Sequence, residues 1–266
     1  MFSISRFVLL GWLLLAFVGL GLAAEATRVS LPTMLQSVGM DHGLAGLLGF
    51  DELGRSVLFR LLSGASTSLL VAVSVVAVSA LVGTGIGMVS SYLGGWVDVV
   101  VVRVIDVFMA FPGILLAIAL AGVLGPGLMN VVIALSVVGW VGFARLTRAQ
   151  VLSLKTRDHV LAAKAMGVSS PAIVRRHLLP LLLAPLLVEI TFGLSSVIVA
   201  EAGLSFLGLG VQPPEASWGQ MIRDGSRFLL VAPHLLIVPT LALMSVVISV
   251  NLLGDGLRDR LDVRSR

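Results

Sequence analysis

Long apolar runs with little charge constrain the fold of this chain more than any other feature. The run from Leu69 to Val89 has no charged residue and does not alternate between apolar and polar positions. Crossing a hydrocarbon core of about 30 Å takes about 20 apolar helical residues, whereas a membrane β-barrel needs alternating segments of about 10 residues. With 58% hydrophobic and 12% charged residues, the sequence predicts an all-α polytopic membrane protein.

Six stretches satisfy the length and charge requirements for membrane-spanning helices. They cover residues 7–24, 67–90, 104–124, 128–144, 181–206 and 235–253. The first has a second interpretation as a cleavable signal peptide, because Arg6 precedes its apolar core and small residues follow it. The third contains Asp106 and Pro112, and we expect Pro112 to kink it.

The distribution of Lys and Arg predicts the orientation, because basic residues beside spans favour the cytoplasmic side. Only Arg28, Arg55, Arg60, Arg223 and Arg227 of the 18 basic residues fall on the opposite side. Both termini are therefore expected in the cytoplasm. The net charge of +4 is then a signal of topology that needs no nucleic acid, and it favours contact with anionic membrane lipid.

Four regions follow from these spans. They are a first transmembrane helix or signal-anchor at residues 1–24, an external loop at 25–66, a core of five spans at 67–254 and a cytoplasmic tail at 255–266. Residues 51–62 of the external loop predict an interfacial amphipathic helix with Arg60 off its apolar face, the alternative being a solvated loop. The four tryptophans, Trp218 among them, are expected at headgroup level.

The longest cytoplasmic segment, residues 145–180, is rich in basic residues and carries signals for two short helices. Asp158 is expected to cap a helix from His159 to Met166, which Gly167 ends in a left-handed conformation. Ser169 or Ser170 then caps a second helix that ends at Pro180. Small and apolar residues make this segment a predicted docking surface: Val160, Ala162, Ala163, Ile173 and Val174. The alternative is a loop that lies on lipid phosphates.

Several residues inside the spans are candidates for function or close packing. Glu189 and Glu201 are costly in a span, which makes them candidates for a translocation path; Glu189 has the alternative of an ion pair with a partner, and a structural or gating role at the outer mouth is favoured for Glu201. Asp106 is expected to pair with Arg103. Gly83 and Gly87 form a small-residue face for a neighbouring helix, and Asn251 is expected to form an interhelical hydrogen bond.

The residue inventory argues against catalysis by this chain. It has no cysteine, its four histidines lack metal-ligand spacing, and neither of its two lysines belongs to a phosphate-binding loop. We therefore expect a non-catalytic chain with no metal or cofactor of its own. An intramembrane protease and a self-sufficient channel or secondary transporter are the alternatives of another class. No histidine or cysteine lies inside a predicted span to support the first, and the second shows no internal repeat and leaves the cytoplasmic loop without a role.

Residues 159–167, followed by Ile173 and by Leu179-Pro180, resemble the EAA loop of permease subunits in binding-protein-dependent ABC importers. Phrases typical of the dipeptide, oligopeptide and nickel branch lie at residues 51–55, 94–98, 204–214 and 251–259. The glutamate that names the loop motif is Leu161 here, so a charge contact at that position is not expected.

This resemblance implies the type I ABC importer permease fold in a bacterial inner membrane. It also implies partners: a second permease, two ATP-binding subunits that hold ATP and Mg, and an external solute-binding protein. The ATPase-coupling residues that it implies are His159, Val160, Leu161, Ala162, Ala163, Gly167, Ile173 and Pro180. Di- or oligopeptides are the expected cargo, and nickel, a metal chelate or a glutathione-like molecule are alternatives.

Overall fold

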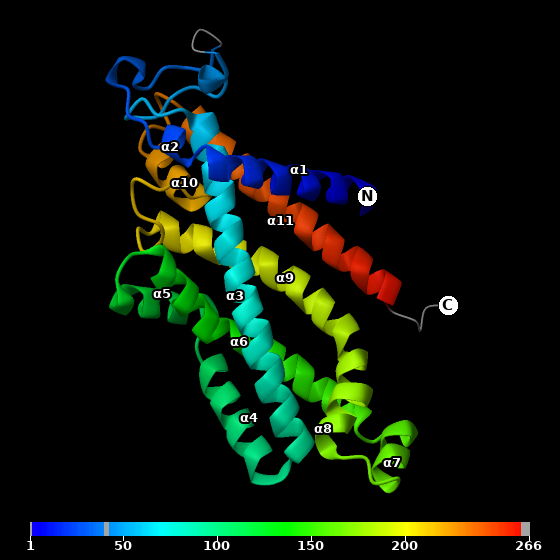
Figure 1. Cartoon of the computed structure of the whole chain (residues 1–266). Coiled ribbons are helices and arrows are strands. Elements are labelled where there is room, and N and C mark those ends of the chain that lie inside the picture. Colours follow the sequence, from blue (N-terminus) through cyan, green and yellow to red (C-terminus); the bar gives the residue numbers. More distant parts are fainter. Residues whose placement is uncertain (1, 40–42, 262–266) are drawn as a thin grey trace.

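The computed structural model describes residues 2–39 and 43–261, and it is built from helices (Figure 1). Within these residues no strand occurs, and the only bridge pairs Phe50 with Ser56. The predicted all-α class is therefore confirmed. The tail residues 262–266 and the loop residues 40–42 lie outside the described part of the chain.

The helices follow one another with short connections. In chain order they are α1 (Phe2–Gly21), α2 (Ala23–Ala26), η1 (Leu31–Thr33), η2 (Gly43–Gly46), α3 (Val57–Leu93), α4 (Gly95–Met109), α5 (Gly113–Leu124), α6 (Leu128–Leu154), α7 (Asp158–Ala165), α8 (Ser170–Ile173), η3 (Val174–Leu178), α9 (Leu179–Phe206), α10 (Trp218–Ser226) and α11 (His234–Leu261). The helices α8, η3 and α9 form one uninterrupted run, and η3 is a single π-helical turn within it.

Four helical segments of the described chain are long and apolar enough to cross a membrane. They are α3, α6, the run from α8 to α9, and α11, and each contains one of the predicted spans. The pair α4 and α5 makes a fifth if its two helices are counted as one broken span. The segment Arg6–Gly21 of α1 is apolar but shorter, so the first span stays a prediction.

The third predicted span is broken rather than kinked. Its two helices, α4 and α5, meet at 83° across a short break, and α4 begins at Gly95 instead of at residue 104. Pro112 has no backbone N–H and disfavours helical conformation in the residue before it, so the first helix ends at Met109 and Pro112 caps the second. The sequence predicted only a kink in a continuous helix at Pro112, whereas the helix is interrupted there and the chain turns sharply.

The helix predicted for residues 51–62 of the external loop also differs from its prediction. Residues 51–56 form a turn, and the helix that begins at Val57 is the start of α3, capped by the Ser56 hydroxyl, which accepts from the Phe59 N–H. Arg60 is only 2% exposed, because its guanidinium forms an ion pair with the buried carboxylate of Asp51. A charge that is neutralised in this way can lie inside the protein.

Contacts of two tryptophans hold α1 against the other helices of the bundle. The Trp12 ring meets the Trp218 ring edge-on at 5.2 Å, and the Trp12 indole N–H donates to the Ser245 hydroxyl at 2.9 Å. Trp218 is fully buried and donates to the carbonyl of Leu61 at 3.0 Å. The Trp218 ring therefore does not face the lipid headgroups, because it is buried and its polar N–H finds a partner inside the protein; its depth in the membrane stays a prediction.

The centre of the bundle is the contact between α3 and α6. A side chain at Gly83 would collide with the backbone of Trp140, and one at Gly87 with the backbone of Ala144. The predicted close packing at these glycines is confirmed. The predicted bond of Asn251 is confirmed as well, since its side-chain oxygen accepts from the Ser195 hydroxyl at 2.7 Å and joins α11 to α9.

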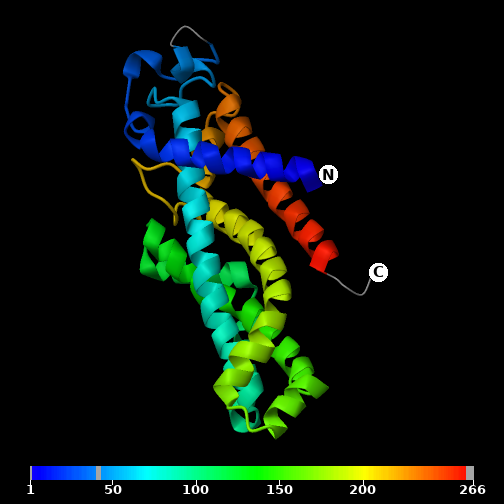
Figure 2. The same ribbon diagram turned by 45° about the vertical axis from the view of Figure 1, so that its right-hand side comes forward.

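The start of α1 and the end of α11 lie on the same side of the molecule as α7, whereas α5 and α10 lie on the opposite side (Figures 1 and 2). This arrangement agrees with a loop and two termini that share one side of a membrane. We call the end that carries α7 the inner end and the end that carries α10 the outer end, following the predicted orientation.

A comparison of two neighbouring glycines tests the importance of the contact between α3 and α6. We expect Gly87→Ala to destabilise the protein by about 1–3 kcal/mol, because the new methyl group overlaps the Ala144 backbone. Gly85→Ala is the matched control, since no atom lies within 4 Å of its added methyl group. Thermal unfolding of both purified variants measures the difference, and equal melting temperatures would contradict the assigned packing.

Candidate functional site

A short helix pair at the inner end, α7 with α8, is the first candidate site. Gly167 ends α7 with φ +78°, where its N–H donates to the carbonyl of Lys164 and the Val168 N–H donates to that of Ala163. These two bonds form a Schellman motif, which satisfies carbonyls that the helix end leaves free. The left-handed conformation predicted for Gly167 is confirmed.

Two details of this helix pair differ from prediction. Arg157 is the N-cap of α7 and no side chain caps the helix, so Asp158 lies in its first turn instead. Pro180 does not end the second helix, because the chain continues through η3 into α9 and places Pro180 in the first turn of α9. The π-helical turn η3 directly precedes Pro180. In a regular α-helix the proline ring would meet the carbonyl four residues earlier, and the wider turn relieves this contact.

One face of the helix pair packs against the protein itself. Val160, Ala163 and Ile173 are buried in a cluster with Leu154 of α6 and Leu178 of η3. The expectation that Val160 and Ile173 fill depressions on a partner, and that Ala163 leaves room for one, is therefore wrong for this conformation. Their burial fixes the helix pair to the inner end of α6.

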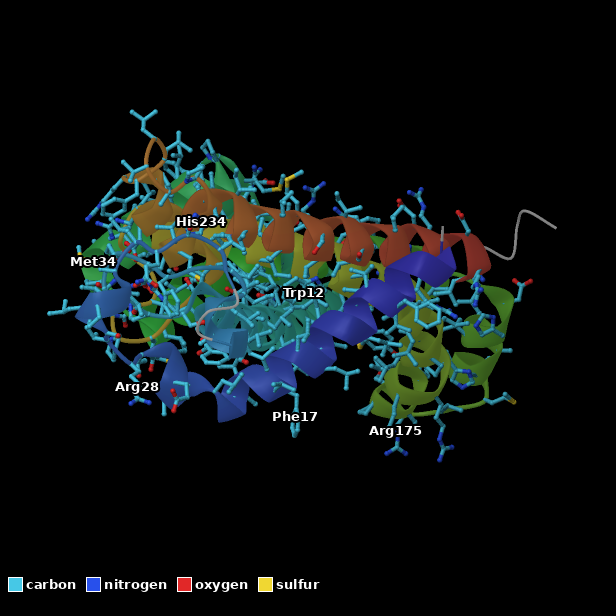
Figure 3. All side chains as sticks on the ribbon, turned by 90° about the horizontal axis from the view of Figure 1, so that it is seen from above. Trp12, Phe17, Arg28, Met34, Arg175 and His234 are labelled. Carbon is cyan, nitrogen blue, oxygen red and sulfur yellow. The ribbon has the colours of Figure 1, made fainter. Side chains whose placement is uncertain are left out.

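The opposite face of α7 is open. Leu161 is 50% exposed and Met166 is 76% exposed, and His159 and Ala162 are exposed beside them. Arg175 of η3 points away from the bundle (Figure 3). A face that combines apolar and small residues with nearby positive charge is suited to contact with another protein.

Polar contacts tie this region to two more helices. The Lys155 ammonium, just before α7, donates to the carbonyl of Ser91 in α3 at 2.8 Å. Arg148 of α6 binds the Asp98 carboxylate of α4 through two hydrogen bonds of 2.7 Å. The sequence analysis missed this pair, which is 50 residues apart; the one available signal was opposite charge near the inner ends of two predicted spans.

Glu189 lines a cavity of about 760 Å³ between α4, α6 and α9. Asp106 and Arg145 line the same cavity, and Gly142 of α6 leaves room for Glu189, whose Oε1 lies 3.1 Å from the position of an added Cβ. Among the described residues no ion pair joins Asp106 to Arg103, so that predicted pair is wrong. A second cavity, of about 830 Å³, reaches Glu189 from the side of α11.

Glu201 lies in a different environment near the outer end. It is 1% exposed, and its carboxylate accepts from the Ser68 hydroxyl of α3 at 3.0 Å and from the Ser205 hydroxyl at 2.7 Å. Ser217, which caps α10, is a further hydrogen-bond partner. Glu201 therefore joins three helices, and a place on a translocation path stays a prediction that its burial does not favour.

Comparisons with known proteins agree with this architecture. Residues 83–266 match the family model described as "Binding-protein-dependent transport system inner membrane component". The chain is 41% identical to the dipeptide transport system permease protein DppC of Alkalihalophilus pseudofirmus, over 82% of this chain and 72% of that protein. It is 42% identical to the glutathione transport system permease protein GsiD of Pectobacterium atrosepticum, over 81% of this chain and 71% of that protein.

A solved structure has the same fold. The inward-facing MetNI methionine ABC transporter contains a chain that superimposes with a TM-score of 0.63 at 20% sequence identity. The match covers 77% of this chain and 97% of that one. The type I ABC importer permease fold expected from the sequence is therefore confirmed.

We expect substitution of Glu201 to lower the melting temperature of the protein and substitution of Glu189 to change it little. Glu201→Ala leaves buried hydroxyl groups without their acceptor, at about 1–3 kcal/mol each, so we expect a melting temperature lower by about 5 °C or more. Glu189→Ala removes a side chain that lines two cavities and should change the melting temperature little. Thermal unfolding of both purified variants tests this, and a larger loss for Glu189→Ala would contradict the two assignments.

Proposed function

The chain belongs to the family of binding-protein-dependent transport system inner membrane components, and on this premise we propose that it is one of two permeases in an ATP-driven importer of short peptides. The coarser statement, an ABC importer permease subunit, follows from family and fold. The cargo, the partners and the coupling mechanism are the proposal.

The observation that carries the proposal is the open face of α7 at the inner end. The chain has no phosphate-binding loop, so active import requires ATP hydrolysis on other subunits. Leu161, Ala162 and Met166 present a small apolar surface that can enter a groove on an ATP-binding subunit. Where other loops of this kind have glutamate, Leu161 makes this contact apolar rather than ionic.

The contacts behind that face provide a route from docking to the cavity. The helix pair is buried against α6, continues without a break into α9, and connects through Lys155 to α3. Glu189 lies on α9, and Gly142 opposite it lies on α6. A displacement of α7 would therefore change the distance between the two helices that border the cavity.

We propose that ATP binding draws the two ATP-binding subunits together and shifts this pair of helices toward an outward-open arrangement. Only a differential affinity of ATP for the two arrangements can produce such a shift. Hydrolysis would return the helices to the inward-open arrangement. An external solute-binding protein would deliver the cargo at the outer end. We place the chain in a bacterial inner membrane, with both termini in the cytoplasm.

Short peptides are the cargo that the cavity and the relatives support best. A free peptide carries an ammonium group and a carboxylate, and the cavity presents the acids Asp106 and Glu189 together with Arg145. The relatives named above are a dipeptide permease and a permease for glutathione, itself a tripeptide. Glutathione therefore belongs to the proposed class of cargo, and nickel or a metal chelate is the alternative.

Substitution of Ala162 tests the docking surface. We expect Ala162→Trp to abolish the ATP hydrolysis that loaded solute-binding protein stimulates in the assembled transporter, because the large ring prevents close approach of the groove. Membrane insertion and melting temperature should be unchanged, since Ala162 is exposed.

Ala77→Trp provides the matched control, because Ala77 is exposed near the middle of α3, away from both the inner and the outer end. Ala163→Leu should differ from both by lowering the melting temperature, since Ala163 is buried against α6. Normal stimulated hydrolysis by Ala162→Trp would refute the docking assignment.

A further inference from the structure

An apolar groove lies on the outside of the bundle between α1, α3, α9 and α11. It has a volume of about 410 Å³, and Leu13, Val73, Leu194 and Val246 line it, one from each helix. Thr191 contributes the one hydroxyl of the lining, and that group donates to the carbonyl of Val188 at 2.7 Å. The groove therefore offers water few free hydrogen-bonding partners, and apolar cavities of this kind stay dry.

The walls of the groove are held by specific contacts. Trp12 is bonded to Ser245 of α11 and packs on Trp218, and Figure 3 shows it pointing from α1 into the bundle, while Phe17 points away. The Ser66 hydroxyl of α3 donates to the carbonyl of Ala16. These contacts hold α1 against α3, α10 and α11, and the groove is the space that remains between these helices and α9.

One end of the groove is basic. Arg6 lines it at the inner end of α1, beyond the leucines that form the α1 wall. A guanidinium has five N–H donors, so it can bind a phosphate in addition to another partner. Basic pockets between membrane helices on the cytoplasmic side are typical binding sites for anionic lipid headgroups.

The surroundings of the groove determine what fills it. Three of its walls, α3, α9 and α11, belong to helices long and apolar enough to cross a membrane, so the hydrocarbon of the bilayer can reach the groove. An acyl chain matches the apolar walls, and a phosphate at the inner headgroup level can accept further hydrogen bonds from the guanidinium of Arg6 beside its existing partner. Both parts of a phospholipid thus meet matching chemistry.

We propose that this groove is a binding site for an anionic phospholipid, whose acyl chain lies between α1 and α9 and whose phosphate binds Arg6. The site goes beyond the proposed transport function and does not depend on the cargo. A lipid bound there fills the groove and stabilises the packing of α1 against the bundle.

Photo-cross-linking from two adjacent positions of α1 tests the proposal. The chain has no cysteine, so Leu13→Cys in the groove and Leu14→Cys, exposed and outside it, each introduce the one thiol of this chain. Each variant is labelled with a small diazirine maleimide. The assembled transporter is then placed in vesicles of equal parts phosphatidylglycerol and phosphatidylcholine, and adducts on this chain are identified by mass spectrometry.

We expect the label at Leu13 to form about fivefold more adduct with phosphatidylglycerol than with phosphatidylcholine, the preference expected from one basic side chain near an anionic headgroup. The label at Leu14 should react with both lipids equally. Arg6→Gln should remove the preference at Leu13. Equal adducts at Leu13 with Arg6 intact, or an adduct with a second permease in place of lipid, would overturn the proposal.

Discussion

The close approach of α3 and α6 at Gly83 and Gly87 is the contact on which the rest of this structure depends. At these two positions the backbones of α3 and α6 lie so close that a residue larger than glycine would keep them apart. In a membrane, where lipid is as apolar as leucine, such close packing replaces the hydrophobic effect as the attraction between helices. The position of α6 then determines the position of α7, which is buried against its inner end, and of Gly142, which faces Glu189.

Charged groups in this apolar chain have different surroundings that indicate different roles. Glu201 and Arg60 are buried with partners from other segments, so they hold the outer end together. At the inner end, the ion pair between Arg148 and Asp98 joins α6 to α4. Glu189 and Asp106 instead line a cavity, where a charge can meet a solute. A charge within a span is costly wherever it lies, and its neighbours distinguish a structural group from a transport group.

The sequence predicted much of the fold, because the length and composition of a span follow from the thickness of the bilayer. It also predicted the contact at Gly83 and Gly87, the bond of Asn251 and the turn at Gly167. It did not predict the 83° break at Pro112 or the inward direction of Val160 and Ile173. Helical periodicity shows which residues share a face, but it does not show whether that face meets the same chain or a partner. The burial of Arg60 required knowledge of its contact with Asp51.

Uptake by the purified assembly is the measurement that tests the central claim most directly. The two permeases and their ATP-binding subunits are reconstituted in vesicles that present ATP to the inner end of the permeases, and the solute-binding protein is added at the outer end. The account predicts that a labelled dipeptide accumulates against its gradient only with hydrolysable ATP. Accumulation of nickel in its place would contradict the assigned cargo. Equilibration of the dipeptide through this chain alone, without ATP or an ATP-binding subunit, would contradict the account as a whole.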